Sequence, residues 1–377
     1  MRLGKFKINH YINYIVVGLL LIVLGSMSAA GAKFDSSLLF LLEKMAISII
    51  LAVSLSLVVG FLGELSLGHA GFMCVGAYLG GKISALVVPA LGNGIPALLI
   101  SLVAGCAAAA ICGIIVGIPA LRLRGDYLAI VTLAFGEIVK SLFRNAPDQL
   151  FGGTLGLETP RFDKKYLFMI AFVLVLFTLV VVQNYIRSKH GRAVTAIRDN
   201  EIAARATGIN VTKYKLLTFT LSAALAGMAG VLYSYSNYKV QSAQFGYNYS
   251  IERLVMVVLG GMGSINGSII AAALITWLNT WLPTKLTGDL AVLQNLLYAL
   301  VLIVIVIYNN APKLKGFRDK YNFGTFMDKF RKNTDAGNVK DDKAKWDVVP
   351  TKIEMNEVLS VDFTPQNFGS DSKGGGK

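Results

Sequence analysis

The chain has 377 residues, of which 54% are hydrophobic and only 15% are charged, and its mean hydropathy is +0.59. This balance excludes a water-soluble enzyme, a secreted disulfide scaffold and an intrinsically disordered chain. The net charge of +14 does not indicate a nucleic-acid partner, because the basic residues lie in loops between apolar runs rather than on one face with interleaved aromatics. The composition predicts a membrane protein whose helices contact lipid.

Ten apolar runs, each a candidate membrane span, follow one another along the first 308 residues. They lie near 13–30, 38–62, 67–88, 95–118, 127–143, 167–186, 214–235, 250–260, 266–282 and 289–308. We therefore predict an all-α, polytopic membrane domain over 1–308, with about ten transmembrane or half-spanning helices. The first run has a basic start and also fits a cleaved signal peptide. The polar remainder, 309–377, is predicted to be a disordered tail.

Basic residues set the expected orientation of these spans, because they concentrate in cytoplasmic loops. The segment 187–215 and the start of the tail are rich in them: Arg187, Lys189, Arg192, Arg198, Arg205, Lys213, Lys215, Lys313, Lys315, Arg318 and Lys320. The loop at 144–166 carries four basic residues and weakens this pattern without reversing it. We predict that the segment 187–213 and both termini are cytoplasmic.

Two glycine-rich stretches interrupt the apolar runs in a similar way, GFLGELSLGHAG at 60–71 and LGGMGSINGS at 259–268. Non-helical backbone at membrane depth is tolerated only where it lines a cavity or is buried by protein. A pair of such breaks, one in each half, is typical of a translocation path built from internal repeats. The predicted path residues are Glu64, Ser66, Gly68, His69, Gly71, Gly260, Gly261 and Gly263. The alternative is a pair of ordinary tight turns at the cytoplasmic surface.

Ionisable residues near the membrane have structural as well as functional interpretations. Glu64 and His69 flank the first break and suggest a functional site. If the break reaches the interface instead, Glu64 is hydrated and His69 caps a helix end. Glu137 and Lys140, three residues apart, predict an intrahelical ion pair, with a pore-facing role for Glu137 as the alternative. Lys44 is expected to snorkel from near a span end and is given no function.

Small residues recur every fourth position in two of the predicted spans, and this spacing lets helices approach closely. The two stripes are Gly105, Ala109, Gly113 and Gly117 in the fourth run, and Ala226, Gly230 and Ser234 in the seventh. They predict a tightly packed helical bundle. The three cysteines, Cys74, Cys106 and Cys112, fall inside spans without metal-ligand spacing, so no metal site or disulfide is predicted.

The segment KHGRAVTAIRDNEIAARATGINVTKYK at 189–215 predicts a helix that lies across the surface between two spans. Within it, Glu201, Ala203, Ala204 and Gly208 form the pattern E-x-A-A-x3-G. Two alanines allow close seating against a partner, Glu201 and the arginines give polar anchoring, and a glycine ends the helix. The alternative is an amphipathic helix resting on lipid headgroups.

This pattern resembles the coupling loop in permease subunits of ATP-binding-cassette importers. Four further segments stand in the order seen in one branch of them: GELSLGHAGFMCVGAYLGG at 63–81, LRLRGDYLAIVTLAFGEIVK at 121–140, FGGTLGLETP at 151–160, and LVMVVLGGMGSINGSIIAAAL at 254–274. Together they resemble the LivM-type permease subunits of the branched-chain amino acid importer family, over about 13–308. The tail departs from that pattern.

The resemblance implies a plasma-membrane core made with a sister permease subunit, two cytoplasmic ATPase subunits and an external substrate-binding protein. It implies leucine, isoleucine and valine as substrates, although similar importers carry urea, amides or other amino acids. The ATPase-coupling residues carried over from it are Arg192, Arg198, Glu201, Ala203, Ala204 and Gly208. The chain has no G-x-x-x-x-G-K-[ST] motif, so the energy is expected from the partner ATPases, and no cofactor is predicted.

Two other classes of function compete with the importer. A secondary transporter or channel should place a titratable residue or charge pair unmistakably at mid-membrane, and none is evident. An intramembrane enzyme needs convergent catalytic groups on facing spans, and only the pair of Glu64 and His69 offers itself. No catalytic residue is therefore predicted, and the importer is the favoured function.

Overall fold

The computed structural model of the chain describes residues 36–285, apart from 93, 124, 161 and 163, together with residues 18 and 303. Apart from those two isolated residues, the first and last predicted spans lie outside the described residues, as does the whole predicted tail at 309–377.

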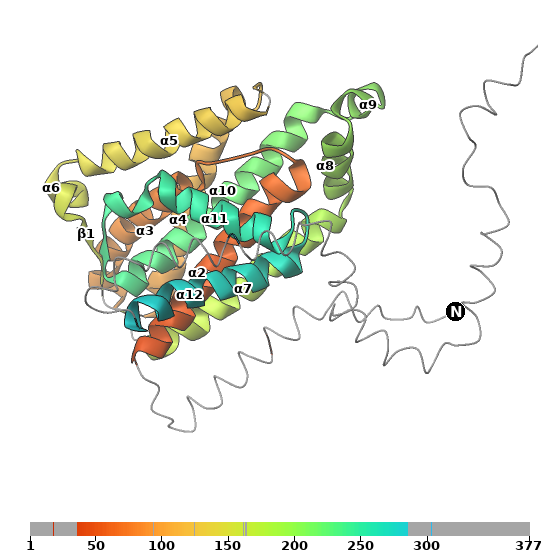
Figure 1. The fold of residues 1–377 in the computed structure, drawn as a ribbon. Coiled ribbons are helices and arrows are strands. Elements are labelled where there is room, and N and C mark those ends of the chain that lie inside the picture. Colours follow the sequence, from red (N-terminus) through yellow and green to blue (C-terminus); the bar gives the residue numbers. More distant parts are fainter. Residues whose placement is uncertain are drawn as a thin grey trace, which may run out of the picture. The chain divides into compact units, whose positions relative to one another are not determined.

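The described part of the chain is almost entirely helical (Figure 1). Its long helices are α2 (Ser36–Ser56), continued by a π-helical turn η2 (Leu57–Leu62), α3 (His69–Leu91), α4 (Ile95–Ala120), α5 (Asp126–Arg144), α7 (Lys164–Arg187), α8 (Lys189–Asp199), α10 (Val211–Asn237), α11 (Tyr247–Gly260) and α12 (Ile265–Lys285). The short elements are α6 (Asp148–Phe151), η3 (Gly153–Leu155), β1 (Leu157–Glu158), α9 (Glu201–Ala206), β2 (Lys239–Val240) and η4 (Ser242–Phe245). Eight of the ten predicted runs coincide with these helices, and the predicted all-α fold is confirmed.

Five stretches in the described part of the chain are long and apolar enough to cross a membrane. They are Ser36–Leu62, His69–Leu91, Ile95–Ala120, Tyr166–Arg187 and Val211–Asn237. Helix α11 has 14 residues, which span about 21 Å at 1.5 Å per residue and fall short of a hydrocarbon core of about 30 Å. It is therefore a half-spanning helix, as the sequence allowed, and the chain is a polytopic membrane protein.

Helices α3, α4 and α10 pack against one another through the predicted small-residue stripes. A Cβ atom added to Gly105, in the α4 stripe, would lie 3.0 Å from the Gly76 carbonyl oxygen of α3, and one added to Gly230, in the α10 stripe, would lie 2.1 Å from the Met73 carbonyl oxygen of α3. The whole stripe of α4 is buried. Backbones approach this closely only where side chains are absent, so the predicted tight packing is confirmed.

The outward face of α4 is apolar and exposed. Leu99, Val103, Ile111 and Ile115 are all more than half exposed in the single chain. An uninterrupted apolar face on a long helix is suited to lipid hydrocarbon or to another apolar helix rather than to water.

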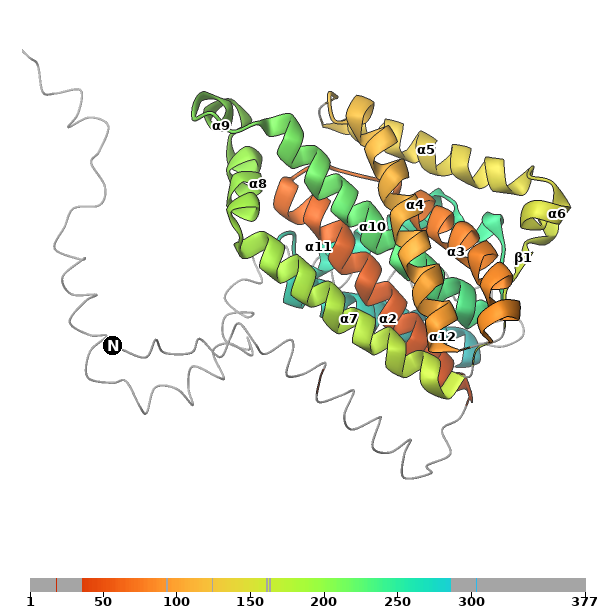
Figure 2. The same cartoon turned by 180° about the vertical axis from the view of Figure 1, so that it is seen from behind.

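The connections gather at two opposite ends of the bundle (Figures 1 and 2). Helices α8 and α9 lie at one end. At the other end β1 pairs antiparallel with β2, with Leu157 opposite Val240, and this joins the connection between α5 and α7 to the connection between α10 and α11. These two connections therefore lie at the same end of the bundle.

Candidate functional site: a junction between two helix breaks and a surface segment

The two predicted breaks meet at the level of the backbone. A Cβ atom added to Gly60, in η2, would lie 2.5 Å from the backbone nitrogen of Gly263, in the turn between α11 and α12. Gly261 and Gly263 have φ of +89° and +84°, a conformation that favours glycine. On either side of this turn, a Cβ atom on Gly260, the last residue of α11, would lie 2.3 Å from the carbonyl carbon of Gly267 in α12. Glycine is required here because other residues would separate the two breaks.

The second half of the first break, residues 66–71, is buried by protein. The Leu67 amide donates to Thr132 Oγ1 of α5 at 3.1 Å, and the Ala70 amide donates to Ser250 Oγ of α11 at 3.1 Å. A Cβ atom on Gly68 would lie 2.4 Å from the Thr132 carbonyl oxygen, and one on Gly71 would lie 2.9 Å from the Cα of Gly136. Ser66 is buried as well. This part of the predicted path is packed against its neighbours in the conformation described.

His69 is buried at the first residue of α3 and does not cap that helix, whose N-cap residue is Gly68. Its Nε2 atom is hydrogen-bonded to Ser54 Oγ of α2 at 2.8 Å. The Ser54 carbonyl in turn accepts a hydrogen bond from Ser222 Oγ of α10 at 2.6 Å. The prediction that His69 caps a helix end is therefore wrong, and its side chain instead connects two helices of the core.

The segment between α7 and α10 forms two helices rather than the one predicted. Asn200 has extended backbone angles and ends α8, and its side chain accepts a hydrogen bond from the Ala203 amide at 3.0 Å, which caps α9. After α9 the chain turns through Gly208, where φ is +85°. The cap at Asn200 stabilises a new helix start in a different direction, which is why the predicted single helix is wrong.

The two alanines of the E-x-A-A pattern have different environments. Ala204 is buried in a small cluster with Leu62 of η2, Ile197 of α8 and Val211 of α10, so its small side chain is needed for packing within the chain. Ala203 faces outward, and the neighbouring Ile202 is 76% exposed. The outward apolar surface of α9 therefore centres on Ile202, which the sequence analysis did not single out.

A buried lysine connects α9 to the first break. Lys215 Nζ lies 2.5 Å from Glu64 Oε1 and 3.2 Å from Glu201 Oε2, and the lysine side chain is only 4% exposed. Arg205 donates to the other oxygen of Glu201 at 2.6 Å. Glu64 is 12% exposed and ion-paired, so the expectation that it is simply hydrated is wrong.

Arg198 connects α8 to both breaks. Its Nη1 atom donates to the Gly60 carbonyl at 3.1 Å and lies 3.7 Å from the position that a Cβ atom on Gly263 would occupy. Its Nε and Nη2 atoms donate to Asp199 at 3.1 and 3.0 Å, which holds the guanidinium in place. We refer to Gly60, Glu64, Arg198, Glu201, Lys215 and Gly263 as the junction.

Arg192, grouped with these residues by sequence, is exposed and donates to the Arg187 carbonyl at 3.4 Å, outside the junction. Lys215 was missed, because in the sequence it appeared only as one basic residue among seven in a cytoplasmic segment. Its place inside the predicted span at 214–235 and 14 residues after Glu201 was the available signal.

The predicted ion pair between Glu137 and Lys140 is confirmed at 2.9 Å. Glu137 also accepts a hydrogen bond from the Tyr247 amide at 2.9 Å, which fixes the start of α11 against α5. Its role in the structure described is therefore to hold these two helices together.

Comparison with known proteins shows which family the chain resembles. The profile of the family described as "Branched-chain amino acid transport system / permease component" matches residues 37–306. The high-affinity branched-chain amino acid transport system permease protein LivM of Salmonella typhimurium is 40% identical over 262 residues, which cover 61% of this chain and 60% of that protein. The LivM protein of Escherichia coli K12 is 38% identical over 261 residues, with the same coverage.

The ribose import permease protein RbsC of Escherichia coli K12 is 28% identical over 319 residues, which cover 77% of this chain and 91% of that protein. The chain spans less than two thirds of the length of the two LivM proteins. No solved structure matches it significantly. Because the family profile covers well over half of the sequence, the chain belongs to the family of permease components of branched-chain amino acid transport systems.

Proposed function

We propose that this chain is a permease subunit of an ATP-binding-cassette importer that carries leucine, isoleucine and valine across the plasma membrane. The observation that carries the proposal is the junction, where one surface segment contacts both helix breaks through Arg198 and Lys215. An importer driven by a separate ATPase needs such a connection between a surface that receives force and the path that must open.

The proposed assembly contains a sister permease subunit, two ATPase subunits and an external binding protein. Helix α9 is the proposed contact with the ATPase, because it presents Ile202, Ala203 and Arg205 on the surface while its other face is anchored by Ala204. The α8–α9 end then faces the cytoplasm, in agreement with the basic residues of the segment 187–215 and with cytoplasmic termini.

The contact of Gly60 with Gly263 is proposed to be a closed gate of the translocation path. Movement of α8 and α9 would act on Gly60 through Arg198 and on the first break through the ion pair of Lys215 with Glu64. Opening the contact would release the loop at 63–68 and the turn at 261–264, whose amides and carbonyls suit the carboxylate and ammonium of an amino acid.

Uptake of radiolabelled leucine into cells that lack their own importers for it tests this function. We expect uptake only when the chain is expressed with its sister subunit, its ATPase subunits and its binding protein. Uptake without the ATPase subunits would favour a secondary transporter. If the binding protein ignores the three amino acids in calorimetry and binds urea, an amide or a pentose, the substrate assignment is wrong although the importer class stands.

Replacing Ile202 with aspartate is expected to weaken ATPase binding. Burial of an isoleucine side chain contributes about 1.5–3 kcal/mol, so its loss should reduce co-purification of the ATPase by about 10- to 100-fold. Leu155→Asp is the matched control, because Leu155 is also exposed, at 68%, but lies at the opposite end of the bundle. Equal co-purification of the two variants with the ATPase would instead favour a helix that rests on lipid headgroups.

A further inference from the structure

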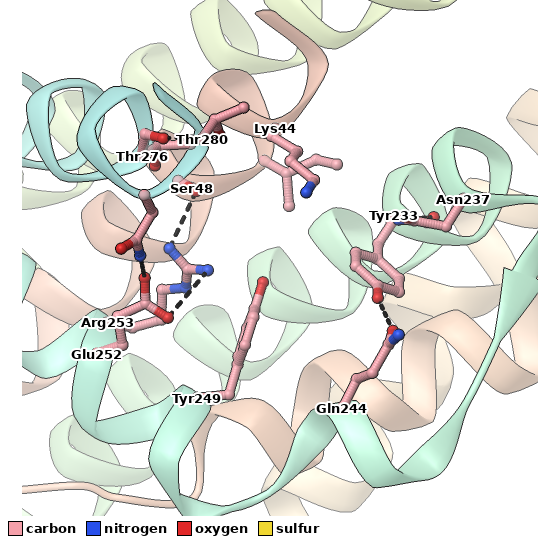
Figure 3. A pocket seen from close by; sticks show the side chains of 12 residues that line it. Lys44, Ser48, Tyr233, Asn237, Gln244, Tyr249, Glu252, Arg253, Thr276 and Thr280 are labelled. Atoms are coloured by element: carbon pink, nitrogen blue, oxygen red, sulfur yellow. Dashed lines mark hydrogen bonds and ion pairs between the residues drawn. The ribbon is translucent and has the colours of Figure 1, made fainter. Parts of the chain in front are cut away.

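A cavity of about 420 Å³, lined mainly by residues with polar side chains, lies away from the junction, between α2, α10, α11 and α12 (Figure 3). None of the residues that the sequence analysis assigned to the path lines it. Ser48, on its wall, precedes Gly60 by 12 residues, which corresponds to about 18 Å along a helix. The cavity is therefore in the half of the bundle that faces away from α8 and α9, which is the outer half in the proposed orientation.

The cavity wall combines two cations with one carboxylate. Arg253 Nη1 donates to Ser48 Oγ at 3.0 Å, and its guanidinium lies over the ring of Tyr249, 4.2 Å from the ring centre. In Figure 3 the amino group of Lys44, the Arg253 guanidinium and the Tyr249 hydroxyl are turned toward the same space. These two cations favour an anionic group in that space.

The third charge on the wall is the carboxylate of Glu252. It accepts a hydrogen bond from Asn279 Nδ2 at 2.5 Å and lies 3.8 Å from Arg253 Nη2. A negative charge beside Arg253 weakens the attraction of that arginine for an anion, and it also provides a partner for an ammonium group. The wall therefore offers charges of both signs a few ångströms apart, with an excess of one positive charge.

The same wall carries a buried hydroxyl that no residue in the described part of the chain hydrogen-bonds. Thr276 is 6% exposed, and its Oγ1 atom has no hydrogen bond within the described part of the chain. A buried hydroxyl without a hydrogen bond is unfavourable, so a polar ligand or water that bonds to it in the cavity would be stabilised. The volume is within the range of about 300–1,000 Å³ that is usual for small-molecule sites.

We propose that this cavity is a transit site for the backbone of an α-amino acid, with the carboxylate between Lys44 and Arg253 and the ammonium toward Glu252. The inference rests on the proposed importer function and specifies where the substrate pauses. Apart from Ile47 and the two tyrosines, every residue that lines the cavity has a polar or charged side chain, so the site is suited to the groups that all amino acids share. Discrimination between side chains is then left to the binding protein. A neutral pentose or urea has no carboxylate to place between Lys44 and Arg253.

Protection of an introduced cysteine tests this site in the assembled transporter. Thr280→Cys, on the cavity wall, is placed in a background whose three native cysteines are replaced and whose leucine uptake is intact. We expect an anionic methanethiosulfonate reagent to react about tenfold faster than a cationic one of the same size, because of the positive excess. Leucine should slow the reaction, whereas leucinamide, which lacks the carboxylate, should not.

Variants of Lys44 complete the test. Lys44→Met should abolish protection by leucine, and Lys44→Arg, which keeps the charge, should retain it. Lys82→Met is the matched control, because Lys82 bonds to the Gln149 carbonyl and does not line the cavity. If leucine is taken up but does not protect the introduced cysteine from the reagent, or if leucinamide protects it equally well, the transit site is wrong while the proposed function stands. Absence of leucine uptake by the unmodified transporter would instead contradict the proposed function, and the transit site with it.

Discussion

Replacing Lys215 with methionine is expected to leave ATP hydrolysis by the partner subunits running while leucine uptake falls by about tenfold or more, a coupling loss of at least about 1.4 kcal/mol. Lys215 forms ion pairs with Glu64, at the first break, and with Glu201, at the start of α9. Without it, movement of α9 is no longer transmitted to the break. Uptake and ATPase activity measured on the same proteoliposomes separate this uncoupling from a loss of assembly.

Stability must be separated from coupling, because removing one partner from a buried ion pair costs about 3–5 kcal/mol. The lower end applies here, since Glu64 and Glu201 keep 12% and 19% of their side-chain exposure. The double variant Glu64→Gln/Lys215→Met removes the unpaired charge at the break and leaves Glu201 with Arg205. We expect the double variant to restore the thermal midpoint that Lys215→Met lowers, but not the leucine uptake that Lys215→Met loses. Recovery of both would show that the lysine only stabilises the fold.

The sequence predicted the helices of the described part well because lipid imposes a simple requirement. Each span needs about 20 apolar residues with its backbone bonded internally, so length and hydropathy alone locate the helices. The spacing of small residues also predicted which faces meet, since the α4 stripe is buried as expected. Local patterns of this kind depend on neighbours within one or two helical turns.

Contacts between distant residues could not be obtained in the same way. The cavity brings Lys44 of α2 together with Arg253 of α11, and the junction pairs residues that are 151 positions apart in the chain. Lys44 therefore seemed to be an ordinary interfacial lysine. The adjacent Glu252 and Arg253 in an apolar run were a usable signal, because charged residues within a span are expensive unless they are paired or functional.

The turn at Asn200 was missed for a different reason. Its side chain is a good helix cap, but the alanines on both sides also favour one continuous helix. The outcome depends on tertiary packing, because Ala204 and Ile197 are buried in the same cluster with Leu62 only when the chain bends between them. Local propensity alone does not decide between the two arrangements.

Replacing Gly60 with alanine is expected to abolish uptake, although the change adds a single methyl group. Its Cβ atom would lie 2.5 Å from the Gly263 nitrogen and 3.1 Å from the Gly263 Cα, and neither backbone atom can rotate away as a side chain would. The two breaks must therefore move apart, at a cost of about 1–3 kcal/mol for overpacking. Helix propensity favours alanine over glycine by about 1 kcal/mol, so an observed loss must come from the contact.

The matched control for this variant is Gly136→Ala, in α5. There an added Cβ atom would be 3.7 Å from its nearest neighbour, the Cα of Gly68, which is ordinary van der Waals contact. We expect this control to keep wild-type uptake and thermal midpoint, whereas Gly60→Ala lowers the midpoint and permits ATP hydrolysis that no longer depends on the binding protein, because the gate cannot close. Normal, binding-protein-dependent uptake by Gly60→Ala would show that the two breaks do not touch in the working transporter, and the closed gate would have to be sought elsewhere along α2 and α11.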